Sequence, residues 1–246
     1  MQVSSHPAEM AGLSKSFMER VAFLNGGPLV KSPVPWVMLT EQHRMPPTIR
    51  TVVAELFYNT QDRQLTDAES IGKREDPPYW PQIVQLFPSL AATRILCIPT
   101  AGKETRSVGT GMHSYCNMEE VDNLMEVVSK LVKLAGVDGK EVAICTMYEG
   151  QREAIDLRIR GDKDYDEIDV KNVDGYQGRE KSIVLLSLVR SNKDNDFGFT
   201  TNPNRLNVSL SRSREMLIIF ANFEMMRRNG KQIFKRLYRQ LPIGMK

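Results

Sequence analysis

Four polar segments of the chain contain residue types that can bind a phosphate ester and stabilise charge during its cleavage. They are Glu41–Met45, Thr146–Gln151, Val173–Glu180 and Asn204–Arg214. Each is expected at a strand-to-helix junction, which is where α/β sheets build their ligand sites. We therefore expect the functional site to be assembled from these four segments.

The arginines are the main candidates for catalysis. Arg205, Arg212 and Arg214 precede an apolar run on a predicted helix, where Arg205 and Arg212, seven residues apart, share a face. An arginine held beside a phosphate stabilises the transition state of phosphoryl transfer, an effect of roughly 10³ to 10⁵ in rate. Taken singly, these arginines equally suit surface salt bridges, and Arg44 alone suits a structural role.

Two glycines, Gly175 and Gly178, flank polar residues directly before an apolar run. Glycine permits a positive φ or a close approach of the backbone to a ligand. The alternative for this spacing alone is an ordinary tight turn.

Apolar periodicity indicates which elements must position these residues. Strands are expected at 36–39, 94–98, 142–145, 167–170, 183–189 and 216–221. Helices are expected at 8–25, 47–57, 117–135, 149–160, 205–214 and 231–241, with Gly136 ending the third of them. Residues 60–93 contain four prolines and are expected to form an irregular surface excursion. This alternation predicts an α/β fold with a mostly parallel sheet.

Composition sets few limits on function. The 246 residues carry a net charge of +3, with 41% hydrophobic and 26% charged residues, as in soluble globular proteins. No membrane span or secretory signal is expected, and the scattered cysteines and histidines predict no metal site. Ten Lys or Arg against two Glu after residue 204 suit either phosphate contacts or a solvated helix face.

Taken together and in order, the four segments are far more specific than any one of them. LTEQHRMPPTIRTVVAELFYNTQ, TMYEGQ, VDGYQGREKSIVLLSLVRSN and FGFTTNPNRLNVSLSRSREMLIIFAN resemble the C-terminal motor domain of superfamily-1 helicases, in the branch that contains the nonsense-mediated-decay helicase. The resemblance covers about residues 8 to 222. It implies a RecA-like domain of the P-loop NTPase type with a parallel central sheet flanked by helices.

The resemblance also implies roles for particular residues. Arg44 and Arg212 match arginines that reach the γ-phosphate of ATP bound on the other motor domain. Glu180 matches the acid that holds the ribose, and Gly178 allows the close approach. The remaining matches are Gln42 and His43 near the adenine, and Thr146 and Asn172 near the nucleic-acid backbone. Contacts to that backbone would make RNA or DNA binding largely independent of sequence and sensitive to salt.

Four departures from the family pattern matter, although those at Ser209 and Ser211 are mild. His43 replaces a tyrosine, Met147 a proline, and Asn172 a small hydroxyl residue, while Ser209 and Ser211 replace alanine and threonine. An imidazole still stacks on adenine, with less area and a charge that depends on pH. The arginines, the glutamate and the glycines of the pattern are all present.

A phosphate cradle of the form G-x-x-x-x-G-K-[ST] occurs nowhere in the sequence, and Asp166-Glu167 follows a charged stretch instead of the apolar strand of a magnesium-binding pair. We therefore expect half a motor: residues 1–35 as a helix and linker leading from a first motor domain, and 36–246 as the second RecA-like domain. ATP and Mg²⁺ would be held mainly by the first domain, in cis or in trans. Single-stranded RNA or DNA is the expected partner, no membrane is involved, and the location is cytoplasmic or nuclear.

Two alternatives stay open. The chain can be a non-catalytic nucleic-acid-binding or regulatory module derived from such a helicase, although that role does not require Arg44 and Arg212 together. It can also be a complete ATPase with an unrecognised phosphate site, which tight Mg-ATP binding by this chain alone would indicate.

Overall fold

A computed structural model describes residues 39–59, 64–107, 114–228 and 232–244. The expected helix at 8–25 and nearly all of the expected strand at 36–39 lie outside these ranges. Everything below concerns the compact unit that extends from Thr40 to Lys246.

A five-stranded sheet forms the centre of this unit, in the order β3-β9-β8-β6-β7 with every neighbouring pair parallel. The strands are β3 (Ile95–Pro99), β6 (Val142–Thr146), β7 (Asp169–Asn172), β8 (Lys181–Ser187) and β9 (Ser213–Ala221). Parallel strands covered on both faces are continuous apolar runs in sequence, and β6 and most of β8 and β9 are buried accordingly. The expected mostly parallel α/β fold is confirmed.

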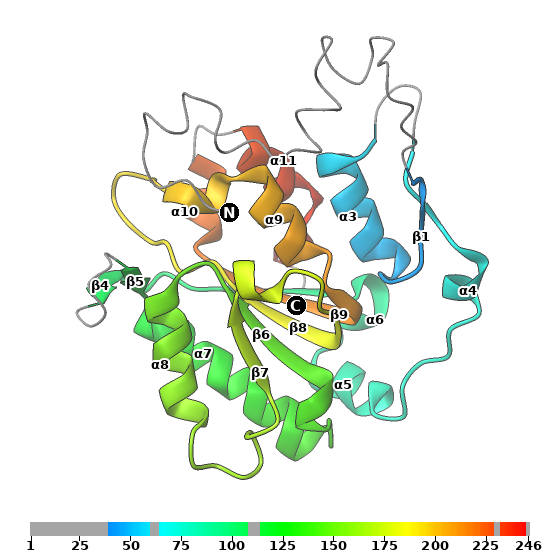
Figure 1. The fold of residues 1–246 in the computed structure, drawn as a ribbon, viewed down its shortest axis with the longest axis horizontal. Coiled ribbons are helices and arrows are strands. Elements are labelled where there is room, and N and C mark those ends of the chain that lie inside the picture. The colour runs from blue at the N-terminus through cyan, green and yellow to red at the C-terminus, as the bar shows by residue number, and fades with distance from the viewer. Residues whose placement is uncertain (1–38, 60–63, 108–113, 229–231, 245–246) are drawn as a thin grey trace. The chain divides into compact units, whose positions relative to one another are not determined.

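Helices cover both faces of the sheet (Figure 1). One face packs against α3 (Pro47–Phe57), α9 (Pro203–Leu210), α10 (Phe223–Arg228) and α11 (Gln232–Gln240). The other packs against α5 (Trp80–Leu86), α6 (Leu90–Thr93), α7 (Met118–Ser129) with its π-helical continuation Lys130–Leu134, and α8 (Glu149–Ile159). Side chains alternate along each strand, so that Cys145 contributes to the first core and Ile144 to the second.

Short elements complete the unit. They are the parallel pair β1 (Glu41–Gln42) with β2 (Thr66–Asp67), the antiparallel pair β4 (Thr105–Ser107) with β5 (Ser114–Cys116), the helix α4 (Glu69–Gly72), and the 3-10 turns Gly139–Glu141, Asp174–Tyr176 and Gly198–Thr201. No helix in the described ranges is both long and apolar enough to cross a membrane.

Sequence cues account for several helix ends. Pro47 occupies the first turn of α3, where the missing N–H costs nothing. The Asn117 side chain caps α7 by accepting a hydrogen bond from the Glu120 amide, and Asn202 caps α9 in the same way. Gly136, with φ of +71°, follows the end of the π-helical segment, as expected for a helix-terminating glycine.

Two expectations about the elements are wrong. Residues 64–93 do not form an irregular excursion, because Trp80, Ile83 and Leu90 are buried in the core and α4, α5 and α6 lie there. Proline was misleading in this region, since Pro81 occupies the first turn of α5, a position that tolerates it.

The expected helix at 205–214 is also shorter. Helix α9 ends at Leu210, and β9 begins at Ser213. Arg212 and Arg214 therefore do not share a helix face with Arg205. The apolar run at 216–221 identifies only the buried part of β9. The polar first residues of β9 also belong to the sheet, because Ser213 pairs with Lys181 of β8.

Candidate functional site

An arginine cluster lies at the start of β8 and β9, which we call the amino edge of the sheet. Glu180 and Arg212 immediately precede the paired first residues Lys181 and Ser213 of these strands. Arg44 lies in the turn between β1 and α3. Its Nε donates to Glu180 Oε2 at 2.5 Å, and its Nη1 donates to the Ser211 carbonyl at 3.1 Å. Three segments distant in sequence therefore meet at one point. We expected the site at strand-to-helix junctions, which are the carboxyl ends of strands. Glu180 and Arg212 instead precede the strands β8 and β9.

Charge at the amino edge is mostly positive. Arg214 Nε lies 3.9 Å from Glu180 Oε1, so one carboxylate is shared by two guanidinium groups. The hydrogen bond from Arg44 lowers the pKa of Glu180 despite the opposing effect of burial, and the charges of Arg44, Arg214 and Arg212 add to the lowering. The acid is therefore ionised and outnumbered by cations, which favours an anionic ligand.

Arg212 is held mainly by backbone carbonyls. Its Nε donates to the Val208 carbonyl at 2.9 Å and its Nη1 to the Arg179 carbonyl at 3.5 Å. Burial and the nearby Arg44 charge lower the pKa of Arg212. A guanidinium remains protonated under such conditions, so its charge is only partly compensated by protein groups.

Gln42 holds the turn that carries Arg44. Its side-chain oxygen accepts from the amides of Arg44 at 2.9 Å and Met45 at 2.7 Å, and its nitrogen donates to the Met45 carbonyl and to Asp67. The side chain is 9% exposed, so these bonds occupy it inside the protein and assign it a positioning role. His43 is exposed, and its Nε2 lies 3.2 Å from Glu41, which leaves the ring accessible to a ligand.

Arg74 is a further positioning residue, which sequence reasoning missed because it lies in the supposed loop. Its guanidinium donates to the carbonyls of Arg44 at 2.8 Å, Arg214 at 2.7 Å and His43 at 3.2 Å. It also lies 3.6 Å from Glu215. One side chain thus ties the Arg44 turn to the start of β9. No signal in the sequence indicated this role, because no helix was expected in this region.

Gly178 adopts φ of +81°, and a Cβ built on it would meet no atom within 4 Å. Its conformation, not crowding by the protein, is what requires glycine. The open space above its backbone is compatible with the close approach of a ligand beside Glu180.

Thr146 and Asn172 lie at the opposite end of the sheet, which we call the carboxyl edge and which comprises the ends of β3, β6, β7, β8 and β9. These two residues are paired across β6 and β7. Asn172 donates to Glu149 at 2.9 Å and accepts from the Gly175 amide at 2.9 Å. The Thr146 side chain is fully buried, and its hydroxyl accepts from the Tyr148 amide. A direct contact of Thr146 with nucleic acid is therefore not supported, and the partly exposed Asn172 is the better candidate.

Beneath the carboxyl edge lies a buried polar network centred on Glu120. Its carboxylate accepts from Ser187 Oγ at 2.6 Å, the Val189 amide at 3.0 Å and Thr100 Oγ1 at 3.1 Å. Burial raises the pKa of Glu120 to about 7, although these hydrogen bonds oppose the rise. Sequence reasoning missed it, since a glutamate in the first turn of a helix is usually an exposed partner of the helix dipole.

The network holds a strained segment after β8. Val189 has φ of +70°, which is rare for a β-branched residue and is tolerated only where the surroundings enforce it. Asn117 donates to its carbonyl at 3.2 Å, and Glu120 accepts from its amide. The next residue, Arg190, is buried and donates to Glu104 at 2.9 Å. Burial alone would lower the pKa of Arg190, but Glu104 and the Tyr148 hydroxyl raise it.

No group of three His, Cys, Asp or Glu side chains is arranged to hold a metal ion within the described ranges. The two edges offer different chemistry. The amino edge has at least partly exposed arginines around one carboxylate, and the carboxyl edge has a buried network of hydrogen bonds.

The parallel sheet with helices on both faces has a RecA-like α/β architecture, and the sequence contains no phosphate cradle. Residues 13–224 match the family described as "AAA domain", and the chain belongs to this family.

Curated relatives extend the match. The "Regulator of nonsense transcripts 1 homolog" of Neurospora crassa is 33% identical over 227 residues, covering 89% of this chain and 19% of that protein. The "ATP-dependent helicase NAM7" of Saccharomyces cerevisiae is 32% identical over 228 residues, covering 89% of this chain and 21% of that protein. The chain thus spans about a fifth of the length of these relatives and is homologous to a part of proteins named as helicases or transcript regulators.

A solved structure, the C-terminal domain of a possible DNA helicase from Lactobacillus plantarum, is 13% identical. It covers 80% of this chain and 94% of its own, with a TM-score of 0.42. This likeness is too distant to carry weight beside the sequence matches.

Proposed function

We propose that the chain is the second motor domain of an ATP-dependent RNA or DNA helicase, comprising residues 36–246, with 1–35 leading from a first motor domain. In this role it completes an ATP site whose phosphate cradle lies on the other domain. The observation that carries the proposal is the convergence of Arg44, Glu180 and Arg212 on one edge of the sheet. The match to proteins named as helicases supports it.

The residues at the amino edge fit a nucleotide. Two guanidinium groups suit phosphate oxygens, a carboxylate suits ribose hydroxyls, and the open left-handed turn at Gly178 admits a close approach. ATP would supply the γ-phosphoryl group that is transferred to water with release of ADP, and Mg²⁺ would neutralise charge on the phosphate oxygens. Arg44 and Arg212 would stabilise the charge on that group, Glu180 would hold the ribose, and His43 would lie near the adenine, with Gln42 positioning Arg44.

The pairing of Arg44 with Glu180 has a consequence for this role. The guanidinium of Arg44 and the carboxylate of Glu180 are 2.5 Å apart. Each can therefore bind a nucleotide only if the ion pair is shared with the nucleotide or broken. Both side chains are partly exposed, and exposed ion pairs contribute little stability. The exchange therefore costs little, and the arginine is available without a rearrangement of the sheet.

Single-stranded nucleic acid is the proposed partner at the carboxyl edge, near Asn172. Sequence-independent binding there would depend on backbone contacts and weaken with salt. The three cysteines are free, which suits a reducing compartment, and we propose a cytoplasmic or nuclear location.

The purified 246-residue chain tests the proposal through ATP hydrolysis and Mg-ATP binding. We expect hydrolysis no faster than in buffer and only weak nucleotide binding, because this sequence has no phosphate cradle. Turnover by the pure chain that Arg212→Ala abolishes, while the exposed control Arg158→Ala does not, would overturn the half-motor proposal and favour a complete ATPase.

A further inference from the structure

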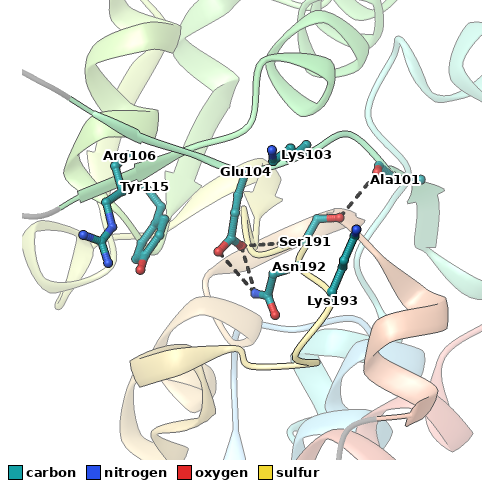
Figure 2. A pocket seen from close by; sticks show the side chains of 8 residues that line it. All are labelled: Ala101, Lys103, Glu104, Arg106, Tyr115, Ser191, Asn192 and Lys193. Carbon is teal, nitrogen blue, oxygen red and sulfur yellow. Dashed lines mark hydrogen bonds between the residues drawn. The ribbon is translucent and has the colours of Figure 1, made fainter.

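A hollow of about 690 Å³ lies at the carboxyl edge, outside the site described above (Figure 2). It is lined by Ala101, Lys103, Glu104, Arg106, Tyr115, Ser191, Asn192 and Lys193. These residues come from the β3–β4 connection, the β4–β5 hairpin and the segment after β8. The volume is in the range of pockets that hold small ligands, and neither the comparisons nor the four sequence segments assign it a role.

The floor of the hollow is fixed by hydrogen bonds around one carboxylate. Glu104 accepts from Arg190 Nε at 2.9 Å, from the Ser191 amide at 2.7 Å and from Asn192 Nδ2 at 3.1 Å, and Figure 2 shows Ser191 and Asn192 around this carboxylate. The buried Arg190 also lies 3.4 Å from Asp196. Arg190 thus offsets one of these two acids, and the three cations of the walls outnumber the acid that remains.

Those walls carry three exposed cations, Lys103, Arg106 and Lys193. Lys103 and Lys193 lie on one side of Glu104, while Arg106 lies beside Tyr115 on the other (Figure 2). Within the described part of the chain, none of the three pairs with a carboxylate, unlike most lysines and arginines elsewhere on this unit. A concave site with three uncompensated cations attracts an anion.

A row of aromatic rings connects this hollow to the region of Asn172. Tyr115 lies edge-on to Tyr148 at 5.4 Å, and Tyr148 lies 4.3 Å from Phe199, measured between ring centroids. Arg205 lies over Phe199 at 4.6 Å and pairs at 3.1 Å with Asp174, two residues beyond β7. Phe199 is 43% exposed and Tyr115 is partly exposed. Tyr148, between them, is only 2% exposed, so Tyr115 and Phe199 are the two rings of this row that reach the surface. Exposed aromatic rings beside cations are typical of surfaces that bind single strands.

We propose that the hollow binds a phosphate-bearing nucleotide of the single strand that passes over the carboxyl edge, so that the strand extends from Asn172 past Phe199 to Lys103, Arg106 and Lys193. This inference rests on the proposed function, and it adds a phosphate contact site to it. Recognition is mainly through the charge of the backbone, with Tyr115 and Phe199 as the two rings that bases can reach, so it does not depend on base identity.

The test compares two triple variants of the 246-residue chain in binding a fluorescein-labelled oligouridylate by fluorescence anisotropy. One is Lys103→Gln, Arg106→Gln, Lys193→Gln. The matched control is Lys73→Gln, Lys130→Gln, Arg160→Gln, which removes the same charge from three ion-paired, at least partly exposed positions at or next to helix ends. We expect the first variant to bind the oligonucleotide roughly tenfold or more weakly than the control variant at low salt. The slope of log affinity against log salt should be smaller in magnitude by about 2, since each of the three lost single-strand phosphate contacts contributes about 0.7.

Circular dichroism and unfolding midpoints verify that both variants are folded, which is expected because all six side chains are at least partly exposed. If both variants bind the oligonucleotide equally and with equal salt slopes, the inference is wrong while the proposed function stands. If the wild-type chain does not bind it at all, the nucleic-acid part of the proposed function fails, and the inference fails with it. Competition by inorganic phosphate or uridine monophosphate at concentrations similar to the oligonucleotide would identify a site for free anions and also overturn the inference.

Discussion

The two edges of the sheet are built by opposite means. At the amino edge, Glu180 is 42% exposed and is shared by Arg44 and Arg214 through ion pairs that water can reach. At the carboxyl edge, Glu120 is 1% exposed and accepts hydrogen bonds from three donors in two segments. Ion pairs at a surface exchange easily, whereas a buried polar network is costly to break. The first edge therefore suits a changing ligand, and the second suits a fixed scaffold.

The two carboxylates also respond to pH in opposite directions. The pKa of Glu180 is lowered by Arg44, so its contribution to stability is present above its ordinary pKa and is lost as the pH falls. The pKa of Glu120 is raised by burial, so the folded state favours its protonated form and loses stability as the pH rises. Acid therefore weakens the contribution of Glu180 at the amino edge, whereas raising the pH toward neutral weakens that of Glu120 at the carboxyl edge.

The largest effect is expected from Glu120→Gln. The pKa of Glu120 rises from 4.5 to about 7 on folding, so the wild-type chain should lose roughly 3 kcal/mol of stability relative to the variant between pH 4.5 and pH 7, at about 1.4 kcal/mol per unit. Urea unfolding at pH 4.5 and pH 7.5 measures this difference. The exposed neighbour Glu119→Gln should not change it. If the difference in free energy of unfolding between the wild type and Glu120→Gln stays constant with pH, the pKa of Glu120 is not raised on folding.

The next effect is expected from Arg74→Lys. A lysine ammonium cannot reach the carbonyls of His43, Arg44 and Arg214 together, so two hydrogen bonds should be lost at roughly 1 kcal/mol each. We expect the free energy of unfolding to fall by about 2 kcal/mol. Arg158→Lys, at an exposed pair with Asp122, serves as the control and should change it by less than about 0.5 kcal/mol. Equal changes in the two variants would mean that Arg74 does not tie the turn to β9.

The smallest effect is expected from Gly178→Ala. An alanine there must adopt φ of +81°, which costs about 1 to 2 kcal/mol, although no atom obstructs its Cβ. Gly72→Ala is a matched control, because its Cβ also meets open space and its φ is ordinary. Differential scanning calorimetry should show a lower melting temperature for the first variant only. An unchanged melting temperature for Gly178→Ala would mean that the turn relaxes without strain.

The sheet could be predicted from the sequence because its strands contain continuous apolar runs such as 142–145 and 183–186. The arginines and Glu180 could be identified because their motifs are long and ordered. Arg74 and Glu120 could not, since their roles depend on backbone groups and donors far away in sequence. The same limit explains one error of placement, since Arg212 was assigned to a helix that ends before it. It also explains why the burial of Thr146, expected near the nucleic-acid backbone, was not foreseen.

The central claim is that Arg44 and Arg212 act on ATP held by a different motor domain. The direct measurement is the kcat and KM for ATP hydrolysis of a single polypeptide in which a first motor domain with a complete phosphate cradle precedes this chain. Arg212→Ala is compared with the exposed control Arg158→Ala in that polypeptide. We predict that Arg212→Ala lowers kcat by roughly 10³-fold or more and changes KM only a few-fold. A kcat equal to that of the control would contradict the account.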